Sequence, residues 1–129
     1  MADLSTNLPS DEKLPMIVVP HGGPHSCTST AYVPSYAYLC AHGKYAILHV
    51  NYRGSSGFGQ DALESLAGTA GELDVKDCVH ATKHVLDLFP KIDAGRVGFC
   101  GGSHGGYLAG HCIGQYPELF KVAAMRNPV

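Results

Sequence analysis

The chain has 129 residues, of which 45% are hydrophobic and 16% charged, and its formal net charge is −2. This is the composition of one ordinary globular domain without a basic surface for nucleic acid or membrane lipid, and no apolar run approaches the ~20 residues of a spanning helix. The five cysteines form no C-x-x-C pair and the N-terminus has no signal sequence, so we expect mostly buried, reduced thiols in a cytoplasmic protein, with no metal or cofactor motif.

The hydrophobic pattern alternates between strands and helices after a polar tail or linker over residues 1–14. It predicts four strands, at 16–20, 45–52, 96–100 and 120–126. It predicts helices between them, at 31–42 (with Pro34 in the first turn and Gly43 after the last), 73–89 and 104–117, with a weaker patch at 59–66. The series predicts an α/β fold over residues 15–129, with about four parallel strands and helices on both faces.

The glycine-rich stretch FCGGSHGGY (99–107) follows the third predicted strand. Three explanations compete for it: a phosphate-binding loop, a nucleophile elbow and an ordinary tight turn. The spacing matches neither G-x-x-x-x-G-K-[ST] nor G-x-G-x-x-G, and the second glycine-rich loop, GSSGFG (54–59), also lacks the lysine. Nucleotide binding is therefore disfavoured.

A nucleophile elbow fits this stretch better. G-x-S-x-G lies between a predicted strand and a predicted helix, as that motif requires. Ser103 is then the nucleophile, the backbone N–H of His104 donates to an oxyanion, and Gly101 and Gly105 let strand and helix pass closely. The simpler alternative is a glycine-rich turn with an ordinary serine.

The sequence HGGP (21–24) supports the elbow because it directly follows the first predicted strand. An α/β-hydrolase takes its second oxyanion donor from the loop after the corresponding strand. Gly22 and Gly23 allow the backbone to approach a reacting carbonyl group.

Six segments resemble the catalytic domain of the acylaminoacyl peptidases, a branch of the prolyl oligopeptidase family of serine peptidases. They are HGGPH (21–25), VNYRGSSGFGQD (50–61), DVKD (74–77), GGSHGGY (101–107), IGQYPELF (113–120) and RNPV (126–129). The resemblance runs from about residue 14 to the last residue. It implies a partial α/β-hydrolase fold and an exopeptidase that releases N-acylated amino acids from blocked peptides through an acyl-enzyme.

The resemblance also assigns roles to individual residues. Ser103 matches the nucleophile, His104 its backbone donor, and the HGGP loop the other half of the oxyanion hole. Several relatives place a tyrosine at the position of His21, so here we expect an N–H of Gly22 or Gly23 to donate instead. Arg53 matches an arginine after the second strand, for which we expect a buried structural role beside backbone carbonyls.

The base and the acid of a triad are not evident. The triad order on this fold is Ser, Asp, His, yet no aspartate follows Ser103 and the only histidines after it are His104 and His111. His104 is adjacent to the serine, and His111 lies about 12 Å further along a helix. Of the upstream histidines, only His21 and His25 lie on a loop near the predicted site.

We therefore expect about half of an α/β-hydrolase domain, truncated at its C-terminal side and at most feebly active alone. The resemblance implies that the triad Asp and His and an N-terminal β-propeller belong to other parts of the parent enzyme. The parent enzyme would act on N-acylated peptides, and a homo-oligomer is one possible state of its assembly. Two alternatives remain: a non-catalytic chain that binds a full-length subunit, or another α/β-hydrolase such as an esterase or lipase.

Overall fold

The computed structural model of the chain describes residues 12–129, so most of the predicted tail lies outside the described residues. Its four strands are β1 (Leu14–Pro20), β2 (Ala46–Val50), β3 (Ile92–Gly102) and β4 (Val122–Arg126). Its helices are α1 (Pro34–Ala41), α2 (Gln60–Glu64), α3 (Leu73–Leu88) and α4 (His104–Gln115). Each predicted strand and helix is present.

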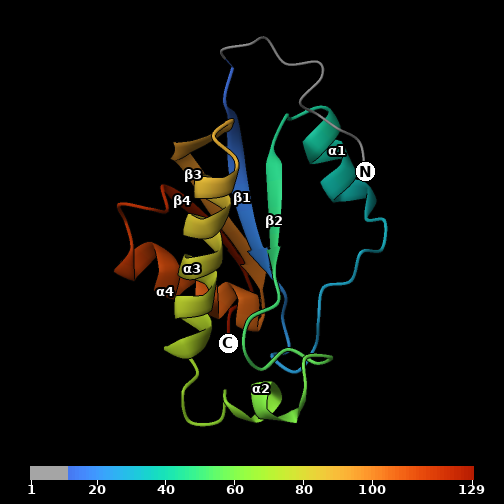
Figure 1. The fold of residues 1–129 in the computed structure, drawn as a ribbon, viewed down its shortest axis with the longest axis vertical. Coiled ribbons are helices and arrows are strands. Elements are labelled where there is room, and N and C mark those ends of the chain that lie inside the picture. Colours follow the sequence, from blue (N-terminus) through green and yellow to red (C-terminus); the bar gives the residue numbers. More distant parts are fainter. Residues whose placement is uncertain (1–11) are drawn as a thin grey trace.

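The strands form one parallel sheet in the order β2-β1-β3-β4 (Figure 1). The three parallel pairings join strands through crossovers that contain helices, as the alternating pattern predicts. The α/β fold with a four-stranded parallel sheet is thus confirmed. Because the strands are parallel, their carboxyl ends all lie at the same end of the sheet. This end carries the loop HGGP, Ser103 and Arg126.

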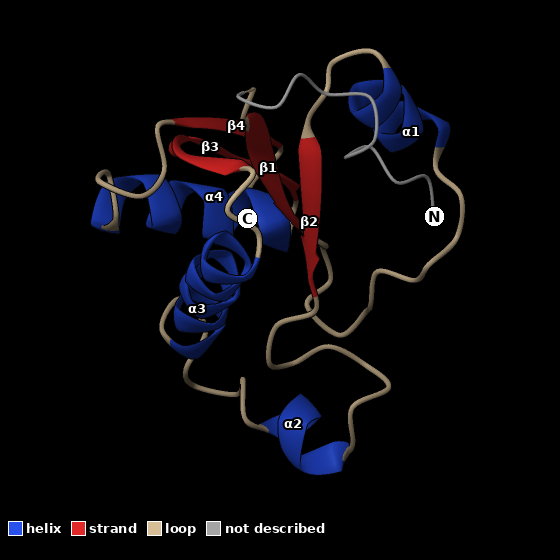
Figure 2. Ribbon diagram, turned by 45° about the horizontal axis from the view of Figure 1, so that its top comes forward, coloured by secondary structure: helices blue, strands red, loops and turns tan. Residues whose placement is uncertain are grey.

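Helices α3 and α4 pack against one face of the sheet, whereas α1 lies on the other side beside β2 (Figure 2). The hydrophobic core fills the space between α3, α4 and the sheet, and Phe99 of β3 meets Phe120 edge-on with ring centroids 5.1 Å apart. Val75 and Leu108 bring α3 and α4 onto this core. Helix α1 buries none of its residues fully.

The start of β3 and the backbone conformation just after α1 differ from the prediction. Strand β3 begins at Ile92, four residues early, because Leu14 pairs with Ile92 across an irregularity in the β1–β3 register. Residues 93–96 of this extension are polar or small, so a search for apolar runs does not detect it. Gly43 does follow α1, but the left-handed residue is Lys44 (φ 53°). Position 43 is glycine because no side chain fits there: a Cβ would lie 2.7 Å from the ring of Tyr45.

No helix within residues 12–129 has the length and apolar character needed to cross a membrane.

Candidate active site

Ser103 occupies the turn between β3 and α4 with φ 55° and ψ −126°. This left-handed backbone is uncommon for a residue with a side chain and costs of order 1–3 kcal/mol. The Ser103 carbonyl accepts hydrogen bonds from the N–H groups of Gly106 (2.9 Å) and Tyr107 (3.0 Å), and its own N–H donates to Arg126 on β4 (3.1 Å). The first turn of α4 and the end of β4 together hold Ser103 in this conformation.

The glycines on either side of Ser103 have a steric reason. A Cβ on Gly101 would lie 2.2 Å from the Gly105 carbonyl oxygen, and a Cβ on Gly105 would lie 2.6 Å from that of Pro20. Real side chains essentially never approach backbone so closely. Strand β3, helix α4 and the end of β1 therefore come together only because both positions are glycine.

The loop after β1 lies directly against Ser103. A Cβ on Gly22 would be 3.2 Å from Ser103 Cβ and 3.9 Å from Ser103 Oγ. Among residues 12–129, no backbone or side-chain acceptor takes a hydrogen bond from the N–H groups of Gly22, Gly23 or His104. These donors stay free at the N-terminal end of α4, where the helix dipole favours a negative charge.

The His21 side chain ties this loop to the loop that follows β2, and it does not contact Ser103 Oγ. Its Nδ1 lies 2.7 Å from the Gly22 carbonyl oxygen, and its Nε2 lies 2.7 Å from Ser55 Oγ. The His21 ring stacks on Tyr52 at 4.5 Å, and the Tyr52 hydroxyl donates to the His21 carbonyl (2.8 Å). Burial, with further contributions from Cys78 and Asp74, raises the pKa of Tyr52 well above its usual value, so this hydroxyl remains a donor.

The His104 side chain points away from the nucleophile into the protein. Its Nε2 donates to Asp74 Oδ2 on α3 over 2.8 Å, and the Asp74 side chain is fully buried. The same carboxylate accepts from the N–H groups of Gly71 (2.7 Å) and Val75 (3.0 Å). Burial raises the pKa of Asp74, but the hydrogen bonds from His104, Gly71 and Val75 outweigh it and hold the pKa below its usual value.

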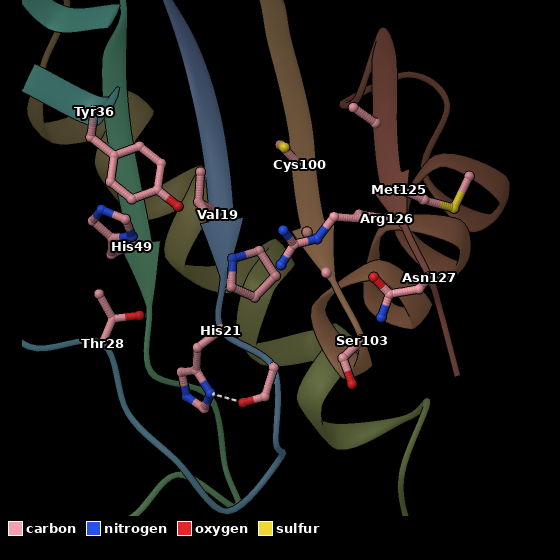
Figure 3. A pocket seen from close by; sticks show the side chains of 15 residues that line it. Val19, His21, Thr28, Tyr36, His49, Cys100, Ser103, Met125, Arg126 and Asn127 are labelled. Atoms are coloured by element: carbon pink, nitrogen blue, oxygen red, sulfur yellow. Dashed lines mark hydrogen bonds between the residues drawn. The ribbon is translucent and has the colours of Figure 1, made fainter. Parts of the chain in front are cut away.

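Ser103 opens into a cavity of about 600 Å³ on the face of the sheet that carries α1 (Figure 3). Figure 3 shows Ser103 and His21 at the same end of the strands and the Arg126 guanidinium between the strands. Cys100 lies back along β3, away from Ser103. Tyr36 of α1 meets His49 of β2 edge-on at 4.7 Å at the far side of the cavity. The cavity could accommodate a peptide-sized group beside the serine.

Within residues 12–129, no side chain hydrogen-bonds Ser103 Oγ. His21 and His104 are engaged as described above, His25 Nδ1 lies 2.9 Å from the Gly54 carbonyl, and His111 pairs with Gln115. The structure therefore brings the predicted nucleophile and oxyanion donors together, and it places none of these histidines as a general base.

Two expectations, one about Arg53 and one about the burial of the cysteines, are wrong. Arg53 is exposed and pairs with a carboxylate, not with carbonyls: its Nε and Nη2 donate to Asp77 over 2.9 and 2.7 Å. DVKD (74–77) supplies this partner one helical turn after Asp74, at a spacing that sequence alone does not link to Arg53. Cys27 and Cys100 are exposed free thiols because they lie on a loop and on the open face of the sheet, whereas Cys78 and Cys112 are buried.

Sequence reasoning also missed Asp74 as a partner of the site. Asp74 opens the predicted helix 73–89, where an acidic residue is usually attributed to the helix dipole. The available signal was its place on the apolar face, between Leu73 and Val75, because a lone carboxylate there must find a buried donor.

Comparisons with known proteins agree with this geometry. A family model described as the prolyl oligopeptidase family matches residues 31–129. Acylamino-acid-releasing enzymes of Sus scrofa and Arabidopsis thaliana are 52% and 50% identical to this chain over 96% and 89% of its residues. The chain spans only 17% and 15% of the lengths of these two relatives.

Solved structures give the same result. An acylaminoacyl peptidase of Pyrococcus horikoshii superposes with a TM-score of 0.86 at 31% identity, over 92% of this chain and 19% of that one. A puromycin-hydrolyzing peptidase of Mycobacterium tuberculosis superposes with a TM-score of 0.84 at 33% identity, over 91% and 17%. These matches confirm a partial α/β-hydrolase fold. Since the family model covers most of the sequence, the chain belongs to the prolyl oligopeptidase family of serine peptidases.

Proposed function

We propose that this chain carries the nucleophile and the oxyanion hole of a serine exopeptidase that releases N-acylated amino acids from blocked peptides. The observation that carries the proposal is the meeting of two elements at one edge of the sheet. Ser103 is held at φ 55° on a strand-to-helix turn, and the Gly22–Gly23 loop lies against it. The substrate class rests on the names of the relatives at about 50% identity.

In this proposal Ser103 Oγ attacks the carbonyl carbon of the acylated residue. The carbonyl oxygen becomes an oxyanion, which accepts hydrogen bonds from the N–H of His104 and from that of Gly22 or Gly23. Because these N–H groups are fixed in the fold, they stabilise the charge without reorganisation. The nitrogen of the shortened peptide takes up the proton released by Ser103 and leaves as an amine, and water then hydrolyses the ester on Ser103 to free the N-acylated amino acid.

The proton of Ser103 needs a base, which we assign to the part of the complete enzyme outside this chain. The support is that the chain spans 17% of the length of its relatives and that no described side chain hydrogen-bonds Ser103 Oγ. We expect the 129-residue chain alone to turn over an acetyl-alanyl chromogenic substrate feebly at most, because losing the base costs several orders of magnitude. Turnover at a rate typical of complete peptidases would contradict this assignment.

The protein completed to the length of its relatives tests the proposal directly. We expect Ser103→Ala to lower the hydrolysis of acetyl-alanyl p-nitroanilide by roughly 10⁶-fold, as removal of a nucleophile does elsewhere. Ser35→Ala is the matched control, since Ser35 is exposed on α1 and its loss should leave the rate unchanged. Full activity in Ser103→Ala would overturn the proposal, whereas preference for a simple p-nitrophenyl ester over the acyl-peptide would favour an esterase.

A second candidate function is association with a complete subunit. The observation in its favour is the exposed edge strand β4, where Val122 and Met125 are 64% and 49% exposed. We also place the protein in the cytoplasm, a location that the five free cysteines support.

A further inference from the structure

We propose that His80 and His84 form a two-ligand site for a divalent transition-metal ion on the outer surface of α3. A separation of four residues puts both side chains on one face of a helix, one turn apart. The two rings are parallel within 3° and their centroids are 6.4 Å apart. Imidazole suits Zn²⁺, Cu²⁺ and Ni²⁺, so the site would take an ion of this class.

Both rings are free to bind. His80 and His84 are exposed, and neither makes a side-chain hydrogen bond among the described residues. Their side chains are exposed, whereas Val75 and Val79 of the same helix face the core. Neither histidine lines the cavity at Ser103, so the two sites are separate. Small rotations of exposed side chains would bring the ring nitrogens to the usual metal–nitrogen distance of about 2.0–2.1 Å.

The charges around the pair balance one another, so they do not oppose the binding of a cation. Asp87 follows His84 by three residues on the same face and forms no ion pair within residues 12–129. Lys76, one turn before His80, is neutralised by Glu72 at 2.8 Å. The neighbouring Lys83 is exposed and can turn away.

The site would be open. The described residues contain no group of three or more His, Cys, Asp or Glu side chains placed to hold a metal ion. Water would therefore complete the coordination, as it does where a protein supplies few ligands. An ion held by both rings would link two successive turns of α3.

Titration of the chain with Ni²⁺ in the presence of a phosphine reductant tests this site, with isothermal calorimetry as the readout. We expect one Ni²⁺ per chain and a Kd at least roughly tenfold weaker in His80→Gln and in His84→Gln, since two-point attachment is lost in each. His42→Gln is the matched control, because His42 is also exposed but its ring packs, tilted by 34°, against Tyr38 and not beside a second histidine. Its Kd should match that of the unmodified chain.

The variants also separate this site from its competitors. The exposed thiols of Cys27 and Cys100 are present in every variant. If Ni²⁺ binds at the thiols, His80→Gln and His84→Gln will keep the original Kd, and the proposal is wrong. Equal weakening by His42→Gln would overturn it too, and far-UV circular dichroism shows whether each variant keeps its helices.

Discussion

Asp74 connects α3 to the turn at Ser103, because its buried carboxylate holds the ring of His104, whose N–H we propose as an oxyanion donor. It accepts hydrogen bonds from His104, Gly71 and Val75, and each group would be left without a partner if the carboxylate were removed. We expect Asp74→Ala to lower the free energy of unfolding by about 3 kcal/mol, measured by urea denaturation. Asp87→Ala on the exposed face of the same helix should change it by less than about 0.5 kcal/mol. Equal effects of the two substitutions would show that the buried network contributes nothing.

The same residue predicts how stability depends on pH. The hydrogen bonds hold the pKa of folded Asp74 below its ordinary value of 3.8. A carboxyl group with a lowered folded-state pKa binds fewer protons than in the unfolded chain, so its stabilisation is present above the unfolded-state pKa and is lost as pH falls through the folded-state pKa. The stability difference between Asp74→Ala and the unmodified chain should therefore be constant from pH 7 to pH 5 and shrink below pH ~4.

How far sequence predicts the site depends on the kind of contact. The turn at Ser103 and the glycines around it were predictable because a short sequence motif corresponds to a particular local backbone conformation. The Asp74–His104 and Arg53–Asp77 pairs join residues 30 and 24 positions apart. No local pattern encodes such pairs, since they depend on how α3 packs against α4 and against the loop after β2.

At the scale of elements, the approach of α4 to β3 depends on Gly101. A methyl group there would lie 2.2 Å from the Gly105 carbonyl oxygen, so strand and helix would have to separate. We expect Gly101→Ala to destabilise the fold by about 1–3 kcal/mol, the usual cost of overpacking. Gly114→Ala is the matched control in α4, because nothing lies within 4 Å of its added methyl group. It should stabilise the chain by about 0.5–1 kcal/mol through helix propensity.

Thermal unfolding followed by circular dichroism measures both glycine variants. The two substitutions add the same methyl group, so opposite changes in Tm would show that the close approach, and not glycine flexibility, decides the outcome at Gly101. Similar changes in Tm for both would contradict the steric explanation.

The ends of helices and strands also depend partly on local sequence and partly on contacts between residues that are distant in sequence. The helical spacing of apolar residues predicted α3, and short apolar runs predicted β1 and β3, because these segments contribute to the hydrophobic core. The early start of β3 comes from pairing between Leu14 and Ile92, which are distant in sequence. Helix α1 begins at Pro34, three residues after the predicted start, because proline suits the first turn and the preceding residue is extended.

At the scale of the whole molecule, the sheet of the described chain has β4 at one edge. Parallel strands are normally buried, and an exposed edge with apolar side chains invites pairing with another chain. We expect the 129-residue chain to associate as its concentration rises, with light scattering after size-exclusion chromatography as the measurement. Ala124→Lys places a charge on the open face of β4 and should shift the chain toward the monomer, because charged edge residues oppose strand pairing. Ser35→Lys is the control, because it adds the same charge at an exposed position of α1. If only Ser35→Lys dissociates the chains, the contact between them lies away from the β4 edge.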